Sequence, residues 1–133
     1  MNGSEIIKIV IDTNVIFMAV YDINSKAGKI VSAALENKIM LFSTDTVKEE
    51  ITRVLKRELN FSDAEINTLI ASLPITWLDK LYYHDFISKT KVKHKADKPV
   101  EALSLALNCQ LLSADAHFKN RAMVDKILAS LNN

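Results

Sequence analysis

Residues 6–14 read IIKIVIDTN, and this stretch decides the fold. Residues 6–11 form a nearly continuous apolar run of the length of one strand, which is typical of a strand buried on both faces. The run ends at Asp12, and Thr13 and Asn14 follow. The stretch therefore predicts a buried strand whose carboxyl end leads directly into polar residues.

Strand-like and helix-like segments alternate along the rest of the chain. Ser62 and Glu65 have the spacing of a capping box, and residues 79–96 match no regular pattern. We expect further strands at residues 39–42, 75–78 and 110–113, and helices at residues 14–20, 25–37, 46–59, 62–73, 100–108 and 121–131. The alternation predicts a single domain over residues 1–133, an α/β sandwich with a mainly parallel central sheet.

Composition excludes several classes of protein. The 133 residues are 49% hydrophobic and 25% charged, as in a soluble globular protein. With 17 basic and 16 acidic residues, the formal net charge is +1, so any nucleic-acid contact must use a local patch or a bound metal. The only glycines, Gly3 and Gly28, are too few for a P-loop or a dinucleotide-binding loop.

The chain has no apolar stretch long enough to cross a membrane and no signal-peptide pattern at its start. Its single cysteine, Cys109, excludes an internal disulfide, so a cytoplasmic location fits best. We interpret Cys109 as a buried, inert thiol rather than as a nucleophile.

Four acidic residues are predicted to meet at one edge of the sheet. Asp12 and Asp115 end strands, Asp97 opens a helix, and Glu50 lies on an amphipathic helix. In open α/β sheets, ligands bind beyond the carboxyl ends of the strands. Clustered carboxylates repel one another unless a cation neutralises them, and hard oxygen ligands suit Mg²⁺ or Mn²⁺. The pattern indicates metal-assisted hydrolysis of a phosphodiester.

Helical geometry separates Glu50 from its neighbour Glu49. Glu50 lies at the flank of an apolar stripe and Glu49 almost opposite it. The stripe consists of Val47, Ile51, Val54 and Leu55. Glu49 is also predicted to form a capping box with Thr46. We therefore expect Glu50 to serve the site and Glu49 to be structural.

Each acid also has a purely structural interpretation. Asp12 and Asp97 are both placed to cap the helices that follow them. Glu50 has the pattern of a solvated helix charge, and Asp115 that of a turn residue. These interpretations remain open for each acid taken alone, whereas a metal site requires that the four acids lie together.

Several other polar residues lie close to the acids in the sequence. Asn14 is a candidate to orient Asp12 or a metal-bound water, and Ser113 to hydrogen-bond a ligand; both also fit as ordinary first-turn or turn residues. His117 fits a surface residue better than a phosphate ligand. Residues 89–98, KTKVKHKADK, form either a solvated loop or a phosphate-binding segment. The candidate phosphate contacts are Lys91, Lys93, Lys95 and Lys98.

Four segments, in this order, resemble a PIN-domain nuclease, of the branch described as toxin components of toxin–antitoxin systems. They are IVIDTN at 9–14, STDTVKEEITRVL at 43–55, DKPVEALSLAL at 97–107 and LLSADAHF at 111–118. The resemblance implies a three-layer α/β/α fold, Mg²⁺ or Mn²⁺ bound by an acidic cluster, and single-stranded RNA as substrate. A small antitoxin protein is the partner that it implies, and a homodimer is compatible with it.

Residue by residue, the four acids of the family fall on Asp12, Glu50, Asp97 and Asp115. The family's asparagine matches Asn14, and its hydroxyl residue before the last acid matches Ser113. The chain departs from the family in having Ser-Ala-Asp at 113–115 where many members have Thr-Gly-Asp, and in a tail that looks helical.

Two other functions fit parts of the pattern. One is a phosphatase that uses Asp12 as a covalent nucleophile, although such enzymes generally need a second aspartate where this chain has Asn14. The other is a catalytically silent nucleic-acid-binding or protein-binding module on the same fold. Metal-dependent cleavage of RNA distinguishes the nuclease from both.

Overall fold

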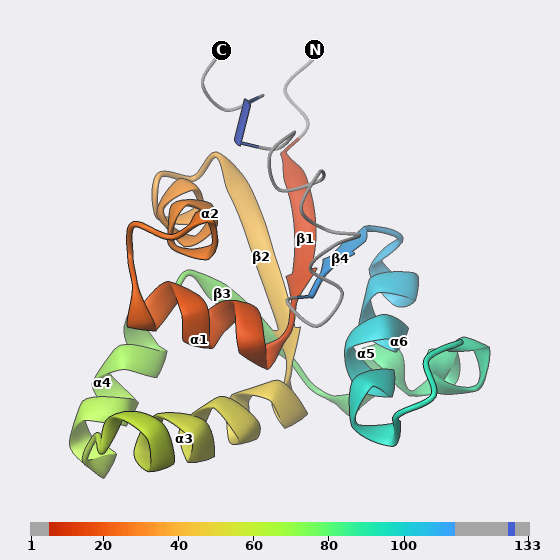
Figure 1. The fold of residues 1–133 in the computed structure, drawn as a ribbon. Helices are drawn as coiled ribbons and strands as arrows, with labels where there is room; N and C mark the ends of the chain where they lie inside the picture. Colours follow the sequence, from red (N-terminus) through yellow and green to blue (C-terminus); the bar gives the residue numbers. More distant parts are fainter. Residues whose placement is uncertain (1–5, 114–127, 130–133) are drawn as a thin grey trace.

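Strand β1 (Ile7–Ile11) lies inside a four-stranded sheet in the computed structural model, which describes residues 6–113 and 128–129 (Figure 1). The strand order is β3-β2-β1-β4, and every pair is parallel. The other strands are β2 (Ile39–Thr44), β3 (Ile75–Leu78) and β4 (Gln110–Leu112). Ile9, Val10 and Ile11 are 0% exposed, because β1 is paired on both edges and covered on both faces. The predicted parallel sheet is confirmed.

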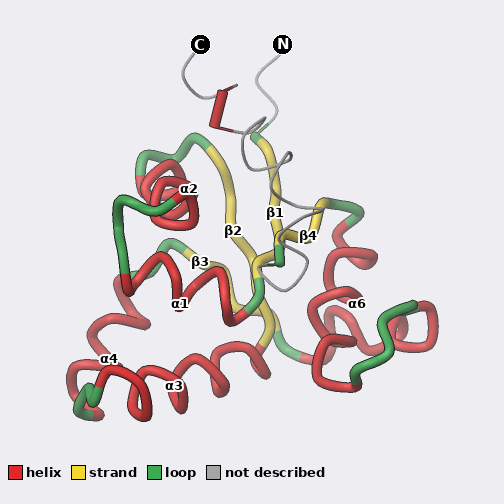
Figure 2. Tube along the Cα trace, viewed as in Figure 1, coloured by secondary structure: helices red, strands yellow, loops and turns green. Residues whose placement is uncertain are grey.

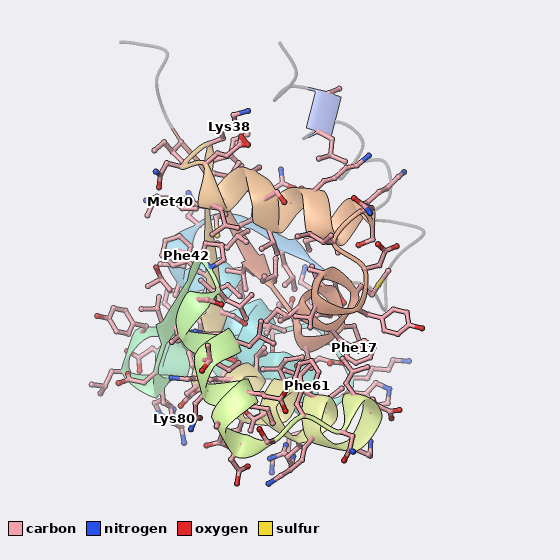
Figure 3. The ribbon with its side chains drawn as sticks, turned by 90° about the vertical axis from the view of Figure 1, so that its left-hand side faces the viewer. Phe17, Lys38, Met40, Phe42, Phe61 and Lys80 are labelled. Carbon is pink, nitrogen blue, oxygen red and sulfur yellow. The ribbon has the colours of Figure 1, made fainter. Side chains whose placement is uncertain are left out.

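Helices cover both faces of the sheet, which gives three layers. Figures 1 and 2 show α1 (Thr13–Tyr21), α2 (Lys26–Leu35), α3 (Asp45–Leu59) and α4 (Asp63–Ser72) on one side, with α6 (Lys98–Leu107) on the other. Figure 3 looks onto the first side, where Phe17 of α1 and Phe61 of the α3–α4 turn belong to the helical layer. Each layer buries an apolar face against the sheet, as Ile16, Ile51 and Leu103 illustrate. The α/β/α fold class is confirmed.

Polar side chains fix where the helices begin. The Ser62 hydroxyl accepts from the backbone N–H of Glu65, and the Glu65 carboxylate accepts from that of Ser62, so the predicted capping box is confirmed. Helix α3 begins one residue before the predicted Thr46, and the capping box predicted there is wrong. β2 continues to Thr44, whose hydroxyl accepts from the N–H of Val47 at 3.1 Å, and no box joins Thr46 to Glu49.

Residues 79–96, which the sequence left without a prediction, form short helical pieces beside α6. These are α5 (Lys80–Tyr83) and two 3₁₀ helices, η1 (His84–Lys89) and η2 (Lys95–Asp97). The buried Tyr83 donates to Oδ1 of Asp45, at the start of α3, at 2.6 Å. A contact between residues 38 positions apart thus holds α5 in place.

Two further sequence predictions concern a closing helix near the end of the chain and segments that could cross a membrane. Most of the helix expected at 121–131 lies outside them, although Leu128 and Ala129 are helical. Within residues 6–113 and 128–129, none of the helices has both the length and the apolar character that crossing a membrane requires.

Candidate active site

A pocket of about 90 Å³ opens beyond the carboxyl ends of the strands. Three segments that are far apart in the sequence build it: the β1–α1 junction, helix α3 and the start of α6. Its lining residues are Asp12, Thr13, Asn14, Val47, Glu50, Ala96, Asp97 and Val100. In Figure 1 the first turns of α1, α3 and α6 point to this region from both sides of the sheet. The pocket thus brings together three of the four predicted acids.

Both carboxylate oxygens of Asp12 are engaged. Oδ1 accepts from the backbone N–H of Val15 at 3.0 Å, which caps α1. Oδ2 accepts a hydrogen bond from the hydroxyl of Ser113, which follows β4. Because β4 pairs with β1, Asp12 and Ser113 meet although they are 101 residues apart. Asp12 therefore both caps α1 and lines the pocket.

Glu50 reaches the pocket from the flank of α3 and is held by Thr13. The Thr13 hydroxyl, on a residue only 5% exposed, donates a hydrogen bond to Oε1 of Glu50. Glu49 is exposed and does not line the pocket. The sequence did not single out Thr13; its only signal was its place directly after Asp12, at the first position of α1.

Asp97 occupies the N-cap position of α6, but its side chain makes no capping hydrogen bond. The interpretation that the Asp97 side chain caps α6 is therefore wrong. The residue is half-buried and lines the pocket. Asn14, from the first turn of α1, is exposed and lines the same pocket.

The fourth acid, Asp115, lies outside the described residues, as does His117. Among the residues that the structure does describe, no three His, Cys, Asp or Glu side chains form a group that could hold a metal ion. Carboxylate oxygens are nevertheless the ligand type that Mg²⁺ and Mn²⁺ prefer. The chemistry of Asp12, Glu50 and Asp97 fits such a cation, although these three described acids do not by themselves form such a group.

The lysines predicted to contact phosphate lie on or directly beside the segment that leads to Ala96 and Asp97 in the pocket lining. Lys91, Lys93 and Lys95 are exposed. Lys98 is half-buried, and its Nζ donates to Oγ1 of Thr90 at 3.5 Å. Ala96 and Asp97, directly after these exposed lysines, belong to the lining. The exposed lysines therefore directly precede one wall of the pocket in the chain.

Cys109 lies away from this chemistry. It is half-buried and directly precedes β4, whereas Ser113 directly follows this strand. Burial raises the pKa of the Cys109 thiol, which disfavours the reactive thiolate. This agrees with its interpretation as an inert thiol.

Fold and site together define an α/β/α protein with an acidic pocket at the carboxyl edge of a parallel sheet. A sequence profile described as "PIN domain" matches residues 8–124. The chain belongs to the PIN-domain family.

Comparison with solved structures supports the same fold. One similar structure is the crystal structure of VapC20 from Mycobacterium tuberculosis, described as a sarcin–ricin loop cleaving toxin. The two share 12% sequence identity, and the similarity covers 76% of this chain and 84% of VapC20 with a TM-score of 0.51. No curated protein matches the sequence.

Proposed function

We propose that the protein is a metal-dependent endoribonuclease that hydrolyses phosphodiester bonds in single-stranded RNA. The observation that carries the proposal is the pocket that joins Asp12, Glu50 and Asp97 from three separate segments. Carboxylates gathered in this way repel one another, which favours a bound cation. Membership of the PIN-domain family supports the same reaction class.

Mg²⁺ or Mn²⁺ is the cofactor that suits these oxygen ligands. Asp12, Asp97 and Asp115 would hold it, and Glu50 would bind it or orient its water. When bound, such a cation activates a water molecule and stabilises negative charge on the phosphate.

The other residues position these groups. Val15 and Ser113 fix the two oxygens of Asp12, so its carboxylate cannot rotate freely. Thr13 fixes Glu50 in the same way. Asn14 adds a polar amide to the wall, and Lys91, Lys93, Lys95 and Lys98 would contact the phosphates of the RNA.

We further propose that the protein is the toxin of a toxin–antitoxin pair, acting in the cytoplasm. The support is its family and the fold that it shares with VapC20, a toxin described as cleaving the sarcin–ricin loop. A small antitoxin protein would be the partner and would cover the acidic pocket. A homodimer is compatible with this role.

The test of the ribonuclease uses purified protein and a labelled single-stranded RNA. Cleavage should require Mg²⁺ or Mn²⁺ and stop with EDTA. Asp12→Asn should abolish cleavage and keep the fold, because asparagine caps helices as well as aspartate does. Cleavage that survives either EDTA or this substitution excludes the proposed mechanism. If the folded wild-type protein binds RNA without cutting it, the protein is instead the catalytically silent nucleic-acid-binding module.

The toxin role has a separate test in growing cells. Induced expression of the wild-type chain should arrest growth, and co-expression of the antitoxin should restore it. Asp12→Asn is the matched control, since it removes one charge from the pocket and leaves the helix cap in place. Equal effects of both chains on growth would mean that toxicity does not come from the pocket.

A further inference from the structure

Glu101 of α6 holds the backbone of the lysine-rich segment that leads to the pocket. Its Oε1 accepts from the N–H of Lys91 at 2.8 Å and from that of Val92 at 3.1 Å. Glu101 follows Asp97 by four residues, so the two side chains leave α6 on the same face. Asp97 lines the pocket and Glu101 does not. One face of α6 thus carries a carboxylate for the site and a carboxylate for the adjoining loop.

Residues 90–96, which we call the lysine loop and which include the first two residues of η2, lead from η1 to Asp97 at the start of α6. At one end the Thr90 hydroxyl donates to the carbonyl of Ile87 at 2.7 Å, and at the other the N–H of Asp97 donates to the carbonyl of His94 at 3.0 Å. Between these ends, the loop is tied to α6 through the two bonds to Glu101. Hydrogen bonds to an ionised acceptor are stronger than neutral ones. The Glu101 carboxylate therefore fixes the part of the loop that carries Lys91 and Lys93.

A carboxylate at this place has two opposite effects on RNA binding. Its negative charge repels phosphate and weakens the attraction of the neighbouring lysines. Its hydrogen bonds order the loop before RNA arrives, so less conformational freedom is lost on binding. The two effects can be separated, because charge and hydrogen-bonding reach can be changed independently at this position.

We propose that Glu101 is a positioning residue for RNA. It orders the lysine loop so that Lys91, Lys93 and Lys95 meet phosphates of the strand that enters the acidic pocket. This inference rests on the proposed function, since it assumes that RNA is the ligand. It adds that a second carboxylate on α6 acts through the loop backbone and takes no part in holding a cation.

The experiment measures binding of a fluorescent single-stranded oligoribonucleotide by proteins that all carry Asp12→Asn, so that no RNA is cut. Glu101→Ala should weaken binding about tenfold, the factor that follows from ordering roughly one residue of backbone on binding. Glu101→Gln keeps an acceptor oxygen and removes the charge that repels phosphate, so it should bind more tightly than Glu101→Ala. Binding by Glu101→Ala that equals or exceeds the parent overturns the inference.

Glu101→Asp gives the strictest comparison, because it keeps the charge and shortens the side chain by one methylene. It should bind RNA several-fold more weakly than the parent, because the shorter side chain no longer reaches the loop backbone. An equal affinity for Glu101→Asp and the parent overturns the inference even if Glu101→Ala fails to fold. Glu58→Ala is the control for net charge, since Glu58 is exposed near the end of α3 and should not weaken binding when removed.

Salt dependence and turnover tell positioning apart from a general loss of structure. The slope of log K against log salt should be smaller for Glu101→Ala by about 0.7 for each phosphate that the lysines no longer neutralise. With Asp12 restored, Glu101→Ala should raise KM and leave kcat near wild type. An unchanged slope together with an unchanged KM overturns the inference. Absence of cleavage by wild type overturns only the proposed reaction, whereas absence of RNA binding by the parent overturns only this inference as long as wild type cleaves RNA.

Discussion

The buried hydroxyl of Thr13 donates a hydrogen bond to Oε1 of Glu50 and so joins the first residue of α1 to α3. Thr13 is 5% exposed, whereas Glu50 is exposed on α3. An exposed glutamate on a helix usually samples several rotamers. This contact selects the one that points to the pocket shared with Asp12 and Asp97.

Thr13→Val should therefore lower the cleavage rate about 10-fold to 100-fold, the usual effect of losing a residue that orients a site ligand. Valine has nearly the shape of threonine, and water can solvate the released Glu50, so the free energy of unfolding should change by only about 1 kcal/mol or less. Thr13→Ser keeps the hydroxyl and is the matched control. Cleavage rates at saturating Mg²⁺, together with melting curves of the same proteins, provide the test. A Thr13→Val rate equal to that of Thr13→Ser would show that the contact is not needed.

The two adjacent glutamates of α3 should behave differently. Glu50→Gln should lower turnover by at least tenfold with little change in Tm, because it alters a carboxylate of the pocket wall. Glu49→Gln should leave turnover near wild type, since Glu49 is exposed and outside the lining. Cleavage rates of the two single variants provide the test. The opposite ranking would require that the second acid of the site be reassigned to Glu49.

How far the sequence predicts the fold depends on whether the decisive contacts are local. The capping box of Ser62 and Glu65 involves residues three positions apart, and the sequence predicts it correctly. At the start of α3, Thr44 and Thr46 are both chemically suitable caps. The choice is made by β2, which pairs with β3 as far as Thr44, and this pairing is not visible in the local sequence.

Residues 79–96 show the same limit more strongly. The hydrogen bond from Tyr83 to Asp45 holds the short helix α5, and Glu101 holds the loop between η1 and η2 through the backbone of Lys91 and Val92. These partners belong to other elements, so local propensity does not reveal them. The position of Asp12 and Asp97 at one pocket could be expected, because parallel topology alone brings such residues to one edge. The bond from Thr13 to Glu50 depends on side-chain rotamers, which periodicity does not predict.

Tyr83 should make stability sensitive to alkaline pH. Burial, followed by the hydrogen bond to Asp45, raises the pKa of Tyr83 above its ordinary value of about 10. Above pH 10 the unfolded chain loses this proton while the folded chain keeps it, so the free energy of unfolding falls as pH rises. Below pH 10 the contribution is fully present.

Melting curves from pH 8 to pH 11 test this linkage, in a range extending about one unit above the ordinary tyrosine pKa. Wild type should lose more Tm over the range than Tyr83→Phe, which has no proton to lose at this position. Tyr82→Phe is the control, because Tyr82 is 57% exposed and neighbours Tyr83 on the same short helix. Tyr83→Phe leaves every other titratable group in place, so the difference between its curve and that of wild type reports on Tyr83. Parallel curves would mean that Tyr83 ionises equally in the folded and unfolded chains.

Removing the charge of Asp97 should stabilise the metal-free protein. The Asp97 side chain makes no capping hydrogen bond, so Asp97→Asn sacrifices only its attraction to the helix dipole, about 0.3–1 kcal/mol. Asp12 and Glu50 line the same pocket as Asp97, and each like charge that approaches within a few ångströms costs about 1 kcal/mol or more. The expected rise of Tm in EDTA tests whether this repulsion exceeds the dipole attraction.

Asp63→Asn is the matched control for Asp97→Asn. Asp63 also lies at the start of a helix, but its carboxylate pairs with Lys56 at 2.7 Å, so losing its charge should lower Tm slightly. Mg²⁺ at about 100 times its dissociation constant should stabilise wild type and Asp63→Asn by about 2.7 kcal/mol, and Asp97→Asn by less. Differential scanning fluorimetry across a MgCl₂ series measures both effects. A lower Tm for Asp97→Asn in EDTA, with the same Mg²⁺ shift as wild type, would mean that Asp97 neither repels the other acids nor helps to hold a cation.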